Sequence, residues 1–387
     1  MFNVLAKVAL INTTYEISLN WIGKLIKLLI ESIGSVGIGI IIFSLILKFI
    51  VMPFDVIQRI SMRRQNNMMK ENEAKMKKLQ KQYANNKEMY AKKVNEMYKA
   101  SGISMLSSCL PMILSIVVFI VAINAFNAYA TYSAVHNYND MVSAYNQSIV
   151  RQCDGIYEKS EYGYIITGAD ADEKAETIQQ TAKEEVKTAY DKTISKRTNF
   201  LWIKNIWVTD SSFKHPIPDH ENFIEEVKRQ KFEVKGEKVK LESLKTSAYD
   251  KDNYNKVTAN LTQAKAEPNG YFILIALSIA VTLLQQWISN KAQKEQQQFA
   301  TVDGQSATQQ KTMMVMMTIM FAVFAFLYSA SFSIYMITSN LMSMLSTFVI
   351  TKVVDYTENK RELKLLQEKY NKRFPGRAPS SDKEETK

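Results

Sequence analysis

Lys48 is the residue with the clearest capacity for chemistry, because it interrupts a segment that is otherwise apolar enough to enter a membrane. The run from Ser32 to Leu47 carries no charge, and four further apolar residues separate Lys48 from Pro53. About 20 apolar residues span a bilayer, and a cation inside such a span costs roughly 2.5–3.5 kcal/mol. A charge kept at that cost predicts a functional residue that binds acidic or polar groups.

A second interpretation of Lys48 requires no function. The residue lies five positions before Pro53, which is about 7 Å along a helix axis. A lysine stem can extend that far and place its ammonium group among the lipid headgroups. Spacing alone leaves both interpretations open.

Further polar side chains fall inside apolar segments at helical spacing. The segment from Tyr271 to Ile288 carries three of them at four-residue steps, namely Ser278, Thr282 and Gln286. Such a stripe must face protein or water, because hydrocarbon offers no hydrogen bonds. Ser44 lies one helical turn before Lys48, and Tyr335 lies in the last apolar segment. Packing of small residues between helices is the ordinary explanation for the serines.

The histidines and cysteines do not indicate a metal or redox site. The three histidines, His136, His215 and His220, all fall in the polar central region, without a spacing such as HExxH. Cys109 lies in an apolar run and Cys153 in a polar one, so they indicate no disulfide framework. We therefore expect no metal, no cofactor and no catalytic residue.

The composition combines two kinds of segment in one chain of 387 residues. Of these residues 47% are hydrophobic, and the net charge is +11. Apolar stretches of about 20 residues alternate with strongly charged ones, which is typical of a membrane protein with basic cytoplasmic loops. A basic balance also suits contact with anionic lipid or ribosomal RNA. The first apolar stretch, residues 1–12, is short and interrupted by Lys7, so we expect no cleavable signal.

The first 104 residues predict three elements that would position these side chains. Asn20, Lys24, Lys27 and Glu31 recur at helical spacing, so residues 1–31 are predicted to hold an amphipathic helix in the membrane interface. Residues 32–54 form the first predicted span. Residues 55–104 are basic and predict a cytoplasmic helical hairpin with its turn at Asn85-Asn86.

The second half of the chain predicts four more spans around a large polar insert. Residues 105–129 form the second span, 130–270 an extracellular helical insert, 271–355 spans three to five, and 356–387 a basic cytoplasmic tail. A turn near Ser329 divides the apolar stretch 312–354 into two helices. Basic loops at 54–104, 289–311 and 352–387 place the amino-terminus outside and the carboxy-terminus in the cytoplasm.

Four motifs resemble those of the YidC/Oxa1/Alb3 family of membrane protein insertases. The first is Ser44, Lys48 and Pro53, with lysine where most bacterial members carry arginine. The second runs from Met97-Tyr98-Lys99 through Gly102-Ile103-Ser104-Met105 to Cys109-Leu110-Pro111, with Ser104-Met105 in place of Asn-Pro. The others are Phe200 to Ile206 and Tyr335 to Asn340. The resemblance covers residues 17–128, 200–206 and 271–355.

The resemblance implies an all-α polytopic protein of the cell membrane with five transmembrane helices, whose cytoplasmic hairpin receives substrates. We interpret the chain as an insertase, and not an enzyme, that moves nascent membrane proteins into the bilayer through a water-filled groove. The predicted groove residues are Lys48, Ser44, Ser278, Thr282, Gln286 and Tyr335. Candidate partners are nascent membrane proteins, the Sec translocon, the ribosome through the basic tail, and anionic lipids, but not DNA.

Two other functions stay open at this stage. In a small-solute transporter or channel, Lys48 would be the counter-ion of the substrate, but we see no repeated hydropathy pattern of the kind such proteins carry. In a structural assembly factor, the large insert would be the working part.

Overall fold

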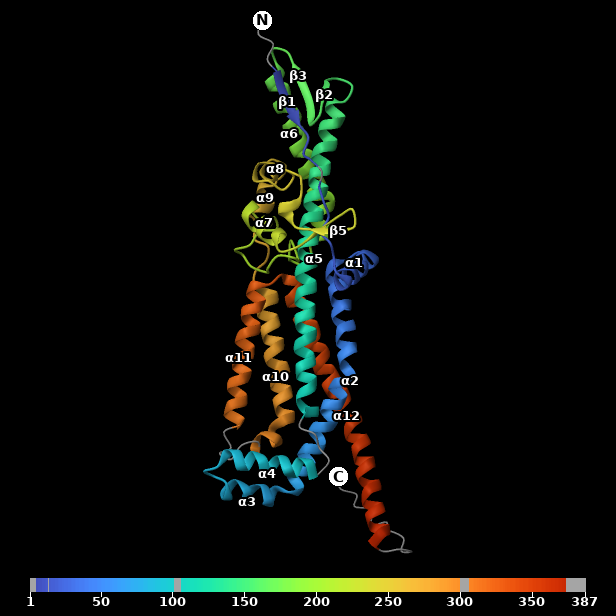
Figure 1. The fold of residues 1–387 in the computed structure, drawn as a ribbon, viewed down its shortest axis with the longest axis vertical. Helices are drawn as coiled ribbons and strands as arrows, with labels where there is room; N and C mark the ends of the chain where they lie inside the picture. The colour runs from blue at the N-terminus through green and yellow to red at the C-terminus, as the bar shows by residue number, and fades with distance from the viewer. Residues whose placement is uncertain (1–4, 13, 101–105, 300–305, 374–387) are drawn as a thin grey trace. The chain divides into compact units, whose positions relative to one another are not determined.

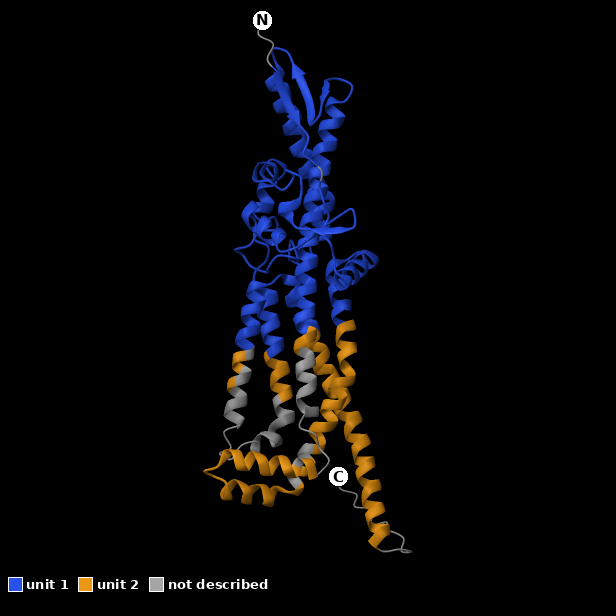
Figure 2. Cartoon of the chain, viewed as in Figure 1, with its two compact units in different colours: residues 1–45, 119–282, 317–338 blue, residues 46–118, 283–316, 339–387 orange. Residues whose placement is uncertain are grey.

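The computed structural model describes residues 5–12, 14–100, 106–299 and 306–373 (Figure 1). It divides into two compact units (Figure 2). Unit 1 comprises residues 1–45, 119–282 and 317–338, and unit 2 comprises residues 46–118, 283–316 and 339–387. Five long helices contribute a portion to each unit.

These five helices contain the apolar segments. They are α2 (Val36–Glu71), α5 (Leu106–Cys153), α10 (Ile273–Phe299), α11 (Ser306–Leu327) and α12 (Ala330–Arg373). Among the described residues, three stretches are long and apolar enough to cross a membrane: 36–64 in α2, 116–153 in α5 and 330–373 in α12. Shorter apolar stretches lie in α10 and α11. A multi-pass membrane protein follows from these helices, while the number of five spans stays a prediction.

Three of the helices are longer than the predicted spans. The first predicted span ends at residue 54, but α2 continues through Pro53 to Glu71. Proline removes one backbone hydrogen bond, and helices in membranes tolerate this loss because neighbouring groups satisfy the freed carbonyl. In the same way α5 continues 24 residues beyond position 129, and α12 continues past residue 355 to Arg373. The turn between α11 and α12 falls at Tyr328-Ser329, as predicted.

The amino-terminal segment differs from the predicted helix over residues 1–31. Among the described residues of this segment, only those of α1 (Trp21–Ile33) are helical, and Asn20 caps the helix by accepting a hydrogen bond from the backbone of Gly23 at 2.7 Å. Residues Leu5–Ala9 instead form strand β1, in which Ala6 and Val8 are buried and their neighbours are exposed. This period of two residues is the pattern of a strand with one covered face.

A three-stranded antiparallel sheet therefore belongs to the insert of unit 1. Its order is β1-β3-β2, where β2 is Glu158–Ser160 and β3 is Gly163–Thr167. Helix α6 (Ala171–Ala189) contacts both β1 and β3. The all-α prediction thus holds only in part: most of the described chain is helical, but the predicted helical insert also contributes strands β2 and β3.

The rest of the insert consists of short elements around aromatic side chains. A π-helical turn, η1 (Tyr190–Ile194), and a 3₁₀ turn, η2 (Ser195–Arg197), follow α6 directly. A second 3₁₀ turn, η3 (Leu241–Ser243), follows strand β5 (Glu237–Val239). The helices are α7 (His220–Lys228), α8 (Lys251–Val257) and α9 (Thr262–Ala266), and β4 (Phe232–Val234) pairs with β5. Tyr138 of α5 packs against the rings of Phe223 and Tyr254 at centroid distances of 5.4 and 5.2 Å. Aromatic packing thus joins α5 to α7 and α8.

In unit 2, α3 (Glu73–Gln82) and α4 (Lys87–Ala100) form a hairpin whose turn includes Asn85 and Asn86, as predicted. A small core holds the two helices together. Its buried members are Met68, Met76, Tyr90 and Val94, with Leu79, Tyr83 and Met97 packed around them.

Candidate functional site

Lys48 lies on α2 in unit 2, and its charge is paired. Its Nζ lies 2.7 Å from Asp55 Oδ2, with the two side chains 11% and 21% exposed. The lysine stem extends along α2 towards Asp55, which lies two residues after Pro53. This direction agrees with the reach that the snorkelling interpretation required, but the partner is a carboxylate of the protein.

Sequence reasoning missed Asp55 and the basic residue that follows it. Asp55 lies seven residues after Lys48, a spacing outside the usual three or four residues of ion pairs on one helix. Arg59 follows one turn later, and the charges of Asp55 and of Asp355 on α12 both act on its guanidinium. The sequence signal that could have revealed these three charged residues is the alternation of positive and negative charge from Lys48 through Asp55 to Arg59.

The same end of α2 is joined to α12 within unit 2 by further charged contacts. Arg63 binds Asp355 and donates a 2.7 Å hydrogen bond to Asn359. Arg64 donates to both carboxylate oxygens of Glu358, at 3.1 and 2.8 Å. Paired guanidinium and carboxylate groups fix geometry as well as charge. The ends of α2 and α12 that carry these charges are therefore held in register.

The polar positions of α10 are buried and satisfied within their own helix. Ser278 donates to the carbonyl of Ile275 at 2.8 Å, and Thr282 donates to that of Ser278 at 2.7 Å. Both residues belong to unit 1, and both are almost fully buried. Gln286, one turn further, belongs to unit 2.

Ser44 and Tyr335 lie in the packed interior of unit 1. The Ser44 hydroxyl donates to the carbonyl of Ile40 at 2.6 Å. The Tyr335 ring lies 5.7 Å from that of Phe126, which in turn packs edge-on against Phe43 at 5.6 Å. Phe126 thus links Tyr335 to the turn of α2 that carries Ser44.

The six predicted groove residues are therefore distributed over both units. Unit 1 holds Ser44, Ser278, Thr282 and Tyr335, whereas unit 2 holds Lys48 and Gln286. Each residue is placed on its predicted helix. A groove that includes all six stays a prediction.

Two serines at the start of α12 have contrasting surroundings. Ser331 is fully buried, and its hydroxyl lies 2.5 Å from that of Ser329. Ser333 is also fully buried, but none of the described residues forms a hydrogen bond with its hydroxyl. An unsatisfied hydroxyl in an apolar interior costs free energy.

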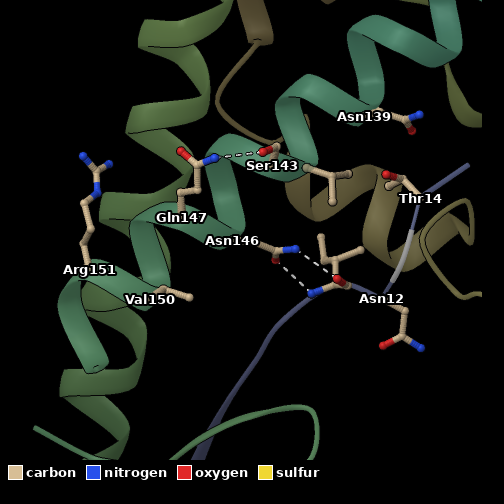
Figure 3. Close-up of a pocket in the computed structure, with 10 residues that line it drawn as sticks. Asn12, Thr14, Asn139, Ser143, Asn146, Gln147, Val150 and Arg151 are labelled. Carbon is tan, nitrogen blue, oxygen red and sulfur yellow. Dashed lines mark hydrogen bonds between the residues drawn. The ribbon is translucent and has the colours of Figure 1, made fainter. Parts of the chain in front are cut away.

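A cavity of about 650 Å³ lies along α5 in the insert of unit 1 (Figure 3). Asn146 binds the main chain of Ile11 twice, accepting from its N–H at 2.9 Å and donating to its carbonyl at 3.0 Å. Gln147 donates to Ser143 at 3.1 Å. The walls are rich in side-chain amides and hydroxyls: Asn12, Thr14, Asn139, Ser143, Asn146 and Gln147.

Among the described residues, no group of three or more His, Cys, Asp or Glu side chains is placed to hold a metal ion. Cys153 is buried and free. The motif from Met97 to Pro111 lies largely outside what the structure describes, since residues 101–105 and the side chains at 106–115 are not placed.

Comparison with known proteins adds a family match. The family model described as 60Kd inner membrane protein matches residues 28–360. Relatives named membrane protein insertase YidC are also similar. That of Leptospira interrogans is 31% identical over 117 residues, which is 30% of this chain and 18% of the relative.

Two shorter relatives of the same name are matched over a larger share of their length. That of Fusobacterium nucleatum is 28% identical over 102 residues, or 26% of this chain and 48% of the relative. That of Caldanaerobacter subterraneus is 23% identical over 113 residues, or 29% and 53%. The chain thus spans about half or less of these curated relatives. No solved structure matches.

Proposed function

The chain belongs to the 60Kd inner membrane protein family, the YidC/Oxa1 family, and on this premise we propose that it inserts nascent protein segments into the lipid bilayer. The matched region includes all of α2, where the candidate charge lies. The names of the similar proteins support the same activity.

We propose five spans, with the amino-terminus outside and the carboxy-terminus in the cytoplasm. Three long apolar helices and the shorter apolar stretches of α10 and α11 support this number. The basic hairpin α3–α4 and the basic end of α12 support the orientation, because short basic loops stay in the cytoplasm. The insert, with its two small sheets, then lies outside.

The observation that carries the proposed mechanism is a cation in the middle of an apolar helix. Lys48 is mostly buried, yet its side chain keeps 11% of its surface exposed. Taking a charged or polar group out of water costs several kcal/mol. A fixed positive charge at membrane depth lowers this cost for an acidic or polar segment that crosses. The apolar part of the same substrate then moves sideways into lipid.

The remaining groove residues would hydrate and shape the path. Ser278, Thr282 and Gln286 present hydroxyl and amide groups at one-turn intervals along α10. Ser44 lies one turn from Lys48 on α2, and Tyr335 contributes a phenol from α12. No covalent bond changes in this process. Nascent membrane proteins are the substrates, and the ribosome, the Sec translocon and anionic lipids are the candidate partners.

The test is insertion of a small one-span or two-span protein into liposomes that contain the purified full chain. We expect Lys48→Arg to retain activity, because it keeps the charge, and Lys48→Ala to lower the insertion rate by about tenfold. Lys24→Ala, which removes an exposed lysine of α1, is the matched control and should have no effect. Normal insertion by the alanine variant at position 48 would refute the charged groove.

A solute transporter is distinguished in the same liposomes. Insertion activity together with unchanged fluxes of small ions and solutes supports the insertase. A flux that depends on Lys48 without any insertion supports the transporter instead.

A further inference from the structure

The ammonium group of Lys48 already forms a salt bridge with a carboxylate of the protein itself, that of Asp55. The 2.7 Å contact with Asp55 joins two residues separated by seven positions on one helix. Seven residues rise by about 10 Å, so the lysine stem has to extend along the helix axis to make this contact. The cation that the proposed function offers to a substrate is therefore already neutralised.

A substrate that binds Lys48 must compete with this tethered acid. A tethered group competes at high effective concentration. Exchange of one carboxylate for another keeps the ammonium group paired throughout. An uncharged segment that displaced Asp55 would instead leave a buried cation without a counter-ion, which is strongly unfavourable.

Asp55 has a second cation within reach. Arg59 follows four residues later, the spacing at which acidic and basic side chains meet on one helix face. The charges of Asp55 and Asp355 both act on the Arg59 guanidinium. Asp355 is itself bound by Arg63, so Arg59 is the cation to which a rotated Asp55 would turn.

We propose that Asp55 is a built-in competitor for Lys48 that makes the hold on a substrate carboxylate brief. An acidic segment displaces Asp55, which rotates to Arg59, and the return of Asp55 to Lys48 releases the segment. The substrate class is thus protein segments that carry Asp or Glu in the portion that crosses. The inference rests on the proposed function, because it requires Lys48 to receive the substrate.

The experiment measures how long a substrate stays beside α2 in liposomes that contain the full chain. Two versions of a single-span substrate carry either Asp or Asn in the crossing portion, next to a photo-crosslinker. With Asp55→Asn we expect the crosslink to the acidic substrate to persist about tenfold longer, since the competitor is lost. The neutral substrate should show no change. Asp55→Glu keeps the carboxylate and should behave as the unaltered protein.

The two hypotheses fail in different ways. If Lys48→Gln changes neither insertion nor crosslinking of the acidic substrate, the proposed function is wrong. If Lys48→Gln blocks the acidic substrate while Asp55→Asn leaves its dwell time unchanged, only the competitor role is wrong. A uniform loss of both substrates with Asp55→Asn, together with a lower melting temperature, would assign Asp55 a purely structural role and also overturn the inference.

Exchanging the charges of Lys48 and Asp55 tests the proposal in a variant that keeps the ion pair and so should still fold. Lys48→Asp combined with Asp55→Lys keeps an ion pair on α2. We expect it to shift prolonged crosslinking away from acidic substrates, because the fixed charge opposite the substrate is now negative. Retention of the preference for acidic segments by this double variant would contradict the proposal.

Discussion

At the scale of single residues, the polar side chains of the long helices differ in how their hydrogen bonds and charges are satisfied. Ser278 and Thr282 satisfy their hydroxyls on the backbone of α10. Lys48 pairs with a carboxylate on its own helix, and part of its surface stays exposed. Ser333 has a fully buried hydroxyl for which the described residues provide no hydrogen bond.

Ser333→Ala is expected to raise the free energy of unfolding by about 1 kcal/mol, because it removes an unsatisfied buried hydroxyl. Ser331→Ala, two residues earlier, is the matched control. It should lower stability by about 1 kcal/mol, since it leaves the Ser329 hydroxyl without its 2.5 Å contact. Thermal melting of the purified protein in detergent measures both. Equal effects of the two substitutions would contradict this account.

At the scale of elements, a close approach between α2 and the aromatic segment 200–206 positions the base of the insert. A Cβ atom at Gly37 would lie 2.1 Å from Cδ2 of the Phe200 ring. Only glycine allows the ring to lie against the helix at this point. The segment carries one of the four motifs that resemble the insertase family, and within unit 1 its Phe200 ring lies against the first turn of α2.

We expect Gly37→Ala to destabilise the protein by about 1–3 kcal/mol, because the added methyl group forces the Phe200 ring out of place. The same substitution in a Phe200→Ala background should cost much less, since the ring is gone. A double-mutant cycle measured by thermal melting tests the coupling. Strict additivity of the two substitutions would show that this contact does not position the insert.

Asp210 connects the residues that follow the aromatic segment 200–206 to the start of α10. It is fully buried, and its carboxylate accepts hydrogen bonds from the backbone of Tyr271 at 2.8 Å and of Leu274 at 2.6 Å. Leu274 is the second residue of α10, whose first N–H groups have no partner within the helix, and Tyr271 lies two residues before the helix begins. Asp210 thus helps to close the long connection between the aromatic segment and α10, together with the Asn269 side chain, which donates to the carbonyls of Asn205 and Thr209.

At the scale of the whole molecule, the apolar helices and the hairpin could be predicted, because apolar length and basic loops are local signals. The sheet of the insert could not, since Leu5 pairs with Thr167 across most of the amino-terminal half of the chain. The candidate cation was likewise evident from its apolar neighbours. Its partner Asp55 was not, because a seven-residue spacing across a proline follows no standard rule for helix pairs.

The amino-terminal segment also contacts α5 through a pair of titratable side chains, Glu16 and His136. Glu16 Oε1 lies 3.1 Å from Nδ1 of His136. Burial alone would raise the pKa of Glu16, but the hydrogen bond and charge of His136 lower this pKa below its ordinary value. The resulting stability is present above the unfolded-state pKa and is lost as the pH falls through the folded-state pKa.

We therefore expect the melting temperature of the unaltered protein to exceed that of Glu16→Gln at pH 5.5, and the difference to shrink as the pH falls below the ordinary pKa of a glutamate. An ordinary histidine is protonated over this whole range, so only the carboxylate changes. Melting curves at half-unit steps of pH measure the difference. A difference in melting temperature that stays constant as the pH falls would show that it does not arise from the ionised Glu16 carboxylate.

Because α5 is one continuous helix from Leu106 to Cys153, distances along it follow directly from residue numbers. Between position 129, the predicted membrane boundary, and Asn146 in the amide-lined cavity, the helix rises by about 25 Å. A fully extended polypeptide covers this height with about eight residues. Under the proposed function, a substrate tail shorter than about eight residues would end below the cavity, so contact there would depend on the length of the tail as well as on its chemistry.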